Sequence, residues 1–471
     1  MSAMSSVVII GGGPGGYEAA LVANQLGAEV TVVDRDGLGG SAVLTDCVPS
    51  KTLIATAEVM TDMGAASELG IGFQDARGDA ATSIQVDLGK VNARVKALAA
   101  AQSADIEERL TRRGISIVKG VGRLGVGAGK GGGEVVATRP DGTEESLHAD
   151  AVLVATGAHP RVLPTAQPDG ERILTWEQVY DLTETPSHMI VVGSGVTGAE
   201  FASAYLALGI PVTLVSSRDR VLPGEDADAA TVLEDVLSRR GMTILGRSRM
   251  QSVTRDGDTV TVELTDGRTV TGSHCILALG SIPNSAGLGL EDAGVQLDDG
   301  GFIRIDKVSR TTAPGVYAAG DCTGGVMLAS TAAMSGRIAM RHFLGDAVQP
   351  MDLKQIASNV FTSPEIATVG WSQAAVDSGE IQADVVQLDL RGNPRAKMQG
   401  IHDGFVKLVA RPGTGVVIGG VVVGPRASEL IHPISLAVAA NLTVDQVANT
   451  FTVYPSLSGS VAEAARRLHQ V

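Results

Sequence analysis

The chain of 471 residues has few of the residues that mark secreted, membrane-spanning or nucleic-acid-binding proteins. Its three cysteines, Cys47, Cys275 and Cys322, lie too far apart for a disulfide framework or a zinc pattern. No apolar run approaches the roughly 20 residues of a membrane-spanning helix. Basic side chains number 37 against 52 acidic ones, and the formal charge of −15 disfavours phosphate backbones and anionic lipid. We therefore expect no nucleic-acid partner, no membrane span and no metal.

The first residues also lack the features of a signal peptide. Residues 1–6 carry no basic cluster, and the apolar run that follows them stops at Gly11. Together with the scarcity of cysteine, this predicts a cytoplasmic protein.

Aromatic residues are scarce, at 3%, whereas glycine is abundant, with 59 residues. Many glycines allow tight turns and close approaches of the backbone, as nucleotide-binding α/β proteins require. The length alone predicts about three domains.

A repeat with an offset of 182 residues is the strongest pattern in the sequence. Each copy has an apolar strand, a glycine-rich turn, a helix, a further glycine and a second strand, beginning at Val7 and at Met189. The matched residues are Gly11 and Gly193, Gly13 and Gly195, Gly16 and Gly198, Gly27 and Gly209, and Asp34 and Ser216.

The chemistry of dinucleotide binding explains this pattern. In a G-x-G-x-x-G turn the first glycine makes the turn, the second lets the backbone approach a pyrophosphate, and the third lets helix and strand pack closely. The helix N-terminus then holds the phosphates with its N–H groups. One such motif is weak, but two copies, each between a strand and a helix, predict two nucleotide-binding units.

The residue at the end of the second strand differs between the copies. Asp34 can accept hydrogen bonds from a ribose 2′-OH, which suits the adenosine of FAD. Ser216 would not repel a 2′-phosphate, and Ser217, Arg218 and Arg220 follow it closely. We therefore expect FAD in the first unit and NADPH, alongside NADH, in the second. Alternatively, the two arginines belong to a solvated loop.

Further motifs make the chain similar to the pyridine nucleotide–disulfide oxidoreductases, the family of dihydrolipoamide dehydrogenase and glutathione reductase. Ala155-Thr156-Gly157 resembles the family's ATG segment, and Thr311 to Asp321 resembles its second FAD motif, whose aspartate holds the ribityl chain. Phe361 to Gly370 resembles the start of its dimerisation domain. Without this resemblance, Asp321 could be a turn residue or a helix N-cap.

The resemblance implies an α/β fold with two Rossmann-like dinucleotide-binding domains and a C-terminal α+β dimerisation domain. The expected boundaries are 1–157 and 281–350 for FAD, 158–280 for NAD(P)H, and 351–471 for dimerisation. It also implies a homodimer in which the C-terminal segment reaches over the partner's flavin.

The cofactor-binding residues follow from the motifs and from the family register. In the FAD unit they are Gly11, Gly13, Pro14, Gly15, Gly16, Asp34, Gly40, Ser41, Lys51, Ala155, Thr156, Gly157, Gly320, Asp321, Leu328, Ala329 and Ser330. In the NAD(P)H unit they are Gly193, Gly195, Val196, Thr197, Gly198, Glu200, Ser216, Arg218 and Gly280.

Lys51 and Glu200 resemble the lysine and glutamate that pair beside the flavin N5 in the family. A lysine there would help to stabilise an anionic reduced flavin. Glu200 also has a simpler explanation, because a carboxylate in the first turn of a helix is favoured by the helix dipole.

The redox-active segment departs from the family pattern. The family has Gly-Gly-Thr-Cys, four residues and then Cys, whereas residues 39–51 here are GGSAVLTDCVPSK. The flavin-side cysteine is present as Cys47, but Ala42 replaces the outer one. A dithiol relay needs two sulfurs, so electrons cannot pass through an intramolecular disulfide. Cys47 is either a thiolate against the flavin, favoured by a helix N-terminus and by Lys51, or a small buried residue without a redox role.

The C-terminal acid–base signature is missing as well. The family's histidine falls at Tyr454 and its partner glutamate at Gly459. A phenol is a poor proton shuttle near neutrality. Ser281 also stands where the family often has arginine, and we assign it no function.

These losses in one catalytic unit point to a different electron acceptor. The chain resembles the lipoamide-dehydrogenase-like NAD(P)H:quinone reductases, which share the missing outer cysteine. We expect a FAD-dependent enzyme that passes electrons from NAD(P)H to a quinone, with Lys51, Glu200, Cys47 and Tyr454 as catalytic residues. The alternatives are a soluble NAD(P) transhydrogenase and a non-catalytic flavoprotein subunit.

Overall fold

The computed structural model describes residues 4–72, 84–125, 127 and 133–469. By its internal contacts the chain divides into two compact units. The first consists of Met1–Thr52, Ala93–Arg161 and Leu279–Met351, and the second of Leu53–Asn92, Val162–Ala278 and Asp352–Val471.

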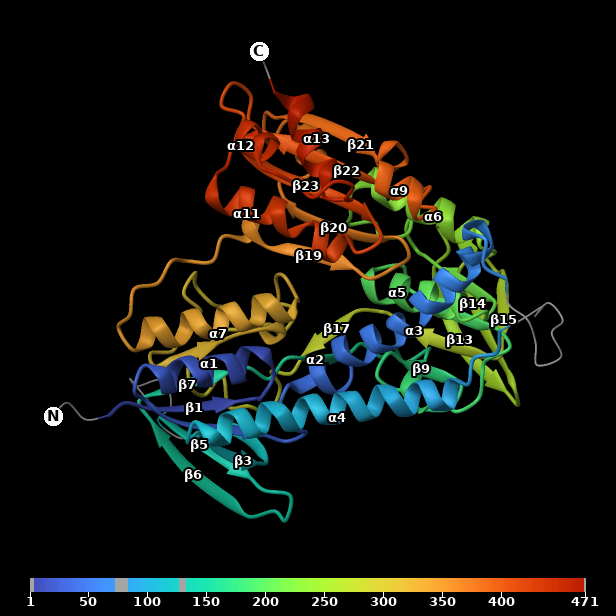
Figure 1. The fold of residues 1–471 in the computed structure, drawn as a ribbon. Coiled ribbons are helices and arrows are strands. Elements are labelled where there is room, and N and C mark those ends of the chain that lie inside the picture. Colours follow the sequence, from blue (N-terminus) through green and yellow to red (C-terminus); the bar gives the residue numbers. More distant parts are fainter. Residues whose placement is uncertain (1–3, 73–83, 126, 128–132, 470–471) are drawn as a thin grey trace. The chain divides into compact units, whose positions relative to one another are not determined.

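A five-stranded parallel sheet forms the centre of the first unit (Figure 1). In spatial order its strands are β18 (Val316–Ala318), β7 (Ala151–Val154), β1 (Ser6–Ile10), β2 (Glu29–Asp34) and β3 (Ser116–Lys119). Side chains alternate between the two faces of a strand, so Val7 and Ile9 enter one hydrophobic cluster while Val8 and Ile10 enter another. Both faces of this sheet are therefore covered.

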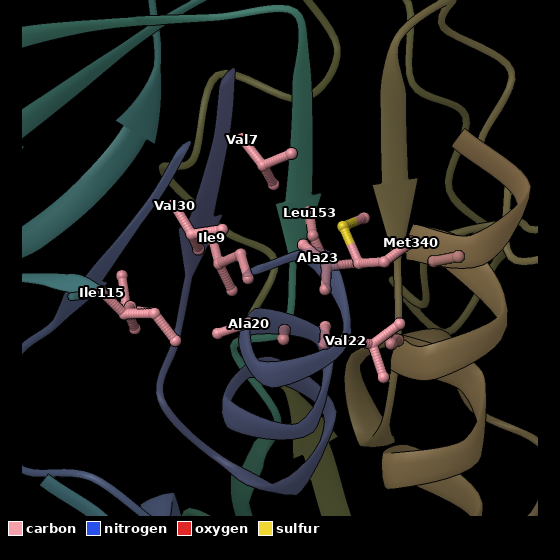
Figure 2. Close-up of a cluster of buried hydrophobic side chains, with 14 of the residues drawn as sticks. Val7, Ile9, Ala20, Val22, Ala23, Val30, Ile115, Leu153 and Met340 are labelled. Atoms are coloured by element: carbon pink, nitrogen blue, oxygen red, sulfur yellow. The ribbon is translucent and has the colours of Figure 1, made fainter. Parts of the chain in front are cut away.

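Helices cover the face of Val7 and Ile9. Helix α1 (Pro14–Gln25) packs beside α7 (Ala329–Phe343), and the C-terminal part of α4 (Leu88–Arg112) joins the same cluster. Figure 2 shows Ala20, Val22 and Ala23 of α1 among the strand residues of this core. A Cβ atom at Gly336 of α7 would lie 2.0 Å from the Gly15 carbonyl oxygen, so α1 and α7 approach closely because their residues are small.

The opposite face of this sheet carries a β-layer. Strands β4 (Val121–Leu124), β5 (Gly133–Thr138) and β6 (Glu144–Ala149) form an antiparallel sheet. The two-stranded ribbon of β8 (Ala158–Pro160) and β17 (Ser281–Pro283) belongs to the same unit. Strands β5 and β6 pair from Gly133 with Ala149 to Thr138 with Glu144.

The second unit repeats the parallel sheet of the first. The strand order is β12 (Thr243–Leu245), β11 (Val212–Val215), β10 (Met189–Val192), β16 (His274–Leu277) and β9 (Ile173–Thr175). Helix α5 (Val196–Ala207) follows β10 and α6 (Ala227–Arg239) follows β11. An antiparallel sheet is added by β13 (Met250–Asp256), β14 (Thr259–Leu264) and β15 (Thr269–Gly272). The strand–turn–helix–strand plan predicted for both copies of the repeat is thus confirmed.

The C-terminal part of the second unit contains an antiparallel sheet. Its order is β19 (Ala357–Val360), β20 (Glu365–Gly370), β23 (Val417–Gly424), β22 (Phe405–Ala410) and β21 (Asp384–Asp389). Its hydrophobic cluster also draws on helices α10 (Ala427–Leu430), α11 (His432–Ala440), α12 (Val444–Asn449) and α13 (Gly459–Leu468). This α+β arrangement follows from the strand-rich segments that begin after residue 350.

The remaining helices are short, except α3. They are α2 (Gly40–Leu44), α3 (Cys47–Ala65), α8 (Gln373–Asp377) and α9 (Pro394–Met398), with 3₁₀ turns η1 (Ala66–Leu69), η2 (Val179–Asp181), η3 (Asp321–Thr323), η4 (Leu353–Gln355) and η5 (Leu390–Gly392). Among the described residues, no helix combines the length and the apolarity required to cross a bilayer.

Candidate nucleotide-binding sites

The two glycine turns leave helix N-termini that no side chain caps. In the described structure, neither Gly13 before α1 nor Gly195 before α5 has a side-chain capping bond. By contrast, α6 is capped by Asp226, whose carboxylate accepts from the N–H groups of Asp228 and Ala229. Because the first N–H groups of a helix have no partner within it, the ends of α1 and α5 suit a bound phosphate.

The first and third glycines of each turn are required by packing within the protein. A Cβ atom at Gly11 would lie 2.3 Å from the Ala155 carbonyl oxygen, and one at Gly16 would lie 1.9 Å from the Gly11 oxygen. In the second turn the corresponding distances are 2.1 Å for Gly193, to Ala278, and 1.8 Å for Gly198, to Gly193. Gly11 and Gly193 also have φ of +104° and +112°, which other residues rarely adopt.

The middle glycine of each turn has no such internal reason. A Cβ atom at Gly13 would meet only the Gly40 Cα, at 3.9 Å, and one at Gly195 would meet no described atom within 4 Å. Their φ values, −67° and −73°, are accessible to any residue. A ligand whose phosphates approach the backbone explains a glycine there. Both turns therefore fit a dinucleotide.

Asp34 lies where a ribose-binding acid is expected and also closes the first turn. One carboxylate oxygen accepts from the Gly12 N–H at 2.7 Å, and the other accepts from Gly37 at 2.7 Å and from Asp36 at 3.0 Å. Burial raises the pKa of this carboxyl, and the three N–H donors oppose that rise. Each oxygen can accept further hydrogen bonds, so the acid is available to a ribose while it orders the loop.

The segment Ala155–Gly157 is held by a residue to which the sequence assigned no role. The Thr156 hydroxyl donates to the Asn284 carbonyl at 2.6 Å, and the Asn284 side-chain amide donates back to the Thr156 carbonyl at 2.9 Å. The Asn284 N–H donates to Gly157 at 2.9 Å. Thr156 and Asn284 are 128 positions apart in the sequence, so only the tertiary structure shows these hydrogen bonds, which join two sequence segments of the first unit.

Asp321 follows strand β18, and its carboxyl is partly buried. Gly320 precedes it with φ of +82°, and burial together with the nearby Asp46 carboxylate raises the pKa of Asp321 to about 6. A desolvated acid gains from hydroxyl donors supplied by a ligand, as a ribityl chain would supply them. Leu328, Ala329 and Ser330 follow in the same unit, where α7 begins.

The segment with Cys47 lies next to the first glycine turn. A Cβ atom at Gly40 would lie 2.8 Å from the Gly13 Cα, and Ser41 follows it in α2. Cys47 is the first residue of α3 and is half-buried, with Lys51 one helical turn later. No disulfide joins the three cysteines, and Cys275 and Cys322 are buried in other elements.

In the second unit, the Ser216 side chain does not face solvent. It is fully buried, its hydroxyl lies 2.6 Å from the Ser194 hydroxyl, and it accepts from the Arg218 N–H at 3.1 Å. Ser216 therefore orders the turn after β11, while Ser217 and Arg218 are exposed beside it.

Glu200 lies on α5 and is 4% exposed. Its carboxylate accepts from the Phe361 N–H at 2.9 Å, and the Ser203 hydroxyl one turn later accepts from Ser363 at 3.1 Å. These bonds attach α5 to the segment that leads into β20, a constraint absent from the sequence pattern.

The structure places the other predicted residues as follows. Val196 and Thr197 begin α5, Lys51 and Gly280 belong to the first unit, Glu200 belongs to the second, and the Tyr454 side chain is exposed.

The fold and the two glycine turns together define an α/β protein with two dinucleotide-binding units and a C-terminal α+β region. The chain belongs to the pyridine nucleotide-disulphide oxidoreductases, matching that family over residues 5–336 and the family's dimerisation domain over residues 356–465. The family assignment and the fold class predicted from the sequence are thus confirmed. The family's cofactors are FAD and NAD(P)H, as predicted.

Three comparisons describe the neighbourhood within this family. The chain is 55% identical to an NAD(P)H dehydrogenase (quinone) of Mycobacterium tuberculosis, over 99% of this chain and 94% of that protein. It is 34% identical to a dihydrolipoyl dehydrogenase of Chlorobaculum tepidum, over 99% and 97%. The crystal structure of LpdA from Mycobacterium tuberculosis superimposes with a TM-score of 0.94 at 54% identity, covering 99% of this chain and 100% of that one.

Proposed function

We propose that this chain is a FAD-dependent NAD(P)H:quinone oxidoreductase that transfers electrons to the acceptor without an intramolecular disulfide. The observation that carries the proposal is Cys47 at the start of α3, with Ala42 on the preceding helix and both other cysteines buried elsewhere. A thiol–disulfide relay needs a second sulfur. The activity in the name of the 55% identical relative supports the same acceptor class.

The first unit supplies the FAD-binding residues in this proposal. FAD supplies two-electron chemistry with NAD(P)H. The uncapped start of α1, with Gly13 and Gly15, holds its pyrophosphate, and Asp34 accepts from the adenosine ribose. Asp321 accepts from ribityl hydroxyls. The other predicted residues of this unit, including Leu328 to Ser330, complete the site.

The second unit supplies the NAD(P)H-binding residues. The start of α5 holds the pyrophosphate, and the end of β11 presents Arg218 rather than a carboxylate to the adenosine ribose. Because nothing acidic occupies the Ser216 position, NADPH is accepted at least as well as NADH.

Lys51 would place positive charge near the isoalloxazine. The family resemblance supports Glu200 as its counter-charge. The bond from Phe361 holds the Glu200 carboxylate in one orientation.

The active enzyme is proposed to be a homodimer. The dimerisation domain of the family matches residues 356–465, and this stretch contains three exposed apolar side chains near its end, Phe451, Val453 and Tyr454. Large exposed apolar side chains in one segment are typical of an interface. Tyr454 of a second copy would then complete the acceptor site. We further propose a cytoplasmic location, where three cysteines without a disulfide stay reduced. The domain division at 157/158, 280/281 and 350/351 remains part of this proposal.

Anaerobic titration tests the central point without knowledge of the physiological quinone. A family member with an intact disulfide stores four electrons, whereas this chain should take up two per FAD. A naphthoquinone should reoxidise the reduced enzyme quickly, and lipoamide or glutathione disulfide should give no turnover. The variant Ala42→Cys serves as the matched control, because it restores the second sulfur without restoring the acid–base pair at Tyr454 and Gly459. Uptake of four electrons by the unmodified protein would contradict the proposal.

The two alternatives are separated by the same steady-state assays. A thionicotinamide acceptor reduced faster than a naphthoquinone would favour a transhydrogenase. No oxidation of NAD(P)H by the pure FAD-loaded protein would favour a non-catalytic subunit.

A further inference from the structure

The turn after β11 is joined to the turn after β12, and this junction brings a third arginine to the nucleotide end of the sheet. The backbone N–H of Ser216 donates to the Leu245 carbonyl at 2.9 Å, and the backbone carbonyl of Ser216 accepts from the Ser248 N–H at 2.7 Å. Between these bonds, the Arg247 N–H donates to the Arg218 carbonyl at 2.8 Å. The backbones of Arg247 and Arg218 are therefore direct neighbours, although 29 residues separate them in sequence.

The close packing of the two turns fixes the position of Arg247. A Cβ atom at Gly246 would lie 3.2 Å from the Asp219 carbonyl oxygen, so the second turn rests on the first. Arg247 itself has φ of +52°, a conformation that residues other than glycine seldom adopt. These constraints hold the base of the side chain where the ends of two adjacent parallel strands meet, which is where this fold binds the adenosine ribose.

The Arg247 guanidinium has an acidic partner within the same junction. Its Nε donates to the Asp219 carboxylate at 2.8 Å, and both side chains are largely exposed, at 80% and 77%. An exposed pair of this kind is weak. A phosphate, with more charge and three acceptor oxygens, is a stronger partner for a guanidinium than a single carboxylate.

We propose that Arg247 and Asp219 form a nucleotide-selectivity pair, in which Arg247 is a ligand for the 2′-phosphate of NADPH and Asp219 competes with that phosphate. When NADH binds, Arg247 keeps its Asp219 partner, so the unphosphorylated ribose leaves no cation unpaired. When NADPH binds, the 2′-phosphate takes the guanidinium and Asp219 turns to solvent. The pair therefore explains how one site accepts both nucleotides. This inference rests on the proposed use of NADPH.

The test compares adenosine 2′,5′-bisphosphate with 5′-AMP by calorimetry on the FAD-loaded protein, alongside kcat/KM for NADPH and NADH. Arg247→Gln should weaken the bisphosphate roughly fivefold, as expected for one exposed charge pair, and change 5′-AMP less than twofold. Asp219→Asn should tighten the bisphosphate and leave 5′-AMP unchanged. The kinetic preference for NADPH should fall with rising salt in the wild type, and less so in Arg247→Gln.

A matched pair in the same unit controls for the loss of charge alone. Arg239, which is exposed, and Asp403, which is half-buried, also form an ion pair, at 2.7 Å. Arg239 ends α6 and so lies at the end of the sheet away from the strand termini that bind nucleotide. Arg239→Gln and Asp403→Asn should leave the ratio of the two affinities unchanged.

Equal losses for both ligands in Arg247→Gln, or no gain in Asp219→Asn, would overturn the inference while leaving NADPH oxidation intact. A wild-type protein that oxidises NADH but neither oxidises NADPH nor binds the bisphosphate would overturn the proposed nucleotide use instead, and the selectivity pair with it.

Discussion

Replacement of Asp321 by Asn tests whether this carboxyl is kept for a ligand at the expense of stability. The folded-state pKa of Asp321 is about 6, against 3.8 for an unperturbed aspartate, because of burial and the Asp46 carboxylate. A shift of this size corresponds to at most about 3 kcal/mol, since one pKa unit is about 1.4 kcal/mol. At pH 7 the cofactor-free wild type bears this cost, and Asp321→Asn removes it. We expect the variant apoprotein to be more stable by about 1–2 kcal/mol after local relaxation.

The sign of the pH dependence follows from the direction of the shift. The folded state binds the proton more tightly than the unfolded state, so Asp321 favours folding below pH 4, and this contribution is lost as the pH rises from about 4 through the folded-state pKa of about 6. Between pH 5.5 and 7.5 the wild type should lose about 1 kcal/mol relative to Asp321→Asn. Urea unfolding of both apoproteins at the two pH values measures this difference.

The control is Asp346→Asn, which changes a partly exposed aspartate of the same unit. Asp346→Asn measures what the loss of one carboxylate at the surface of this unit does to stability by itself. FAD affinity should change in the opposite sense from stability, because Asp321→Asn removes a charged acceptor worth about 1.5–3 kcal/mol to a ribityl hydroxyl. If the difference in free energy of unfolding between the wild type and Asp321→Asn does not vary with pH, the raised pKa is refuted. If the FAD affinity is unchanged in Asp321→Asn, the role of Asp321 in binding the ribityl chain is refuted.

Three further predictions concern the second unit. The free energy of unfolding of Gly195→Ala should lie within about 0.5 kcal/mol of the wild-type value, yet this variant should bind NAD(P)H at least tenfold more weakly. Gly198→Ala should be strongly destabilised, because its Cβ atom would lie 1.8 Å from the Gly193 carbonyl oxygen. Calorimetric melting and nucleotide titration measure the two effects. Lys407→Met should cost about 3–5 kcal/mol in chemical unfolding, because the buried Asp226 carboxylate loses the ammonium that lies 2.8 Å away; adding Asp226→Asn should recover much of the loss. Tyr205→Phe should leave stability unchanged or raise it by up to about 1 kcal/mol, because the buried hydroxyl has no hydrogen-bonding partner among the described residues.

The sequence by itself determined the features that depend on local chemistry. The glycine turns were predictable because only glycine tolerates a φ near +104° or a carbonyl oxygen about 2 Å from its Cβ position, as at Gly11 and Gly16. Two copies at one offset then predicted both nucleotide-binding units. The loss of a disulfide relay was also readable, because Ala42 carries no sulfur in any conformation.

Only the tertiary structure decided which distant residues cooperate with these motifs. Asn284 clasps Thr156 and the Phe361 N–H binds Glu200, yet neither partner has a residue type or spacing that signals the contact. Ser216 was predicted as a cofactor-binding residue, and only the structure shows that its side chain is buried against Ser194. Arg247 reaches the nucleotide end of the sheet because two parallel strands terminate side by side. Hydrogen bonds between segments depend on where strands end in space, and sequence separation does not encode that position.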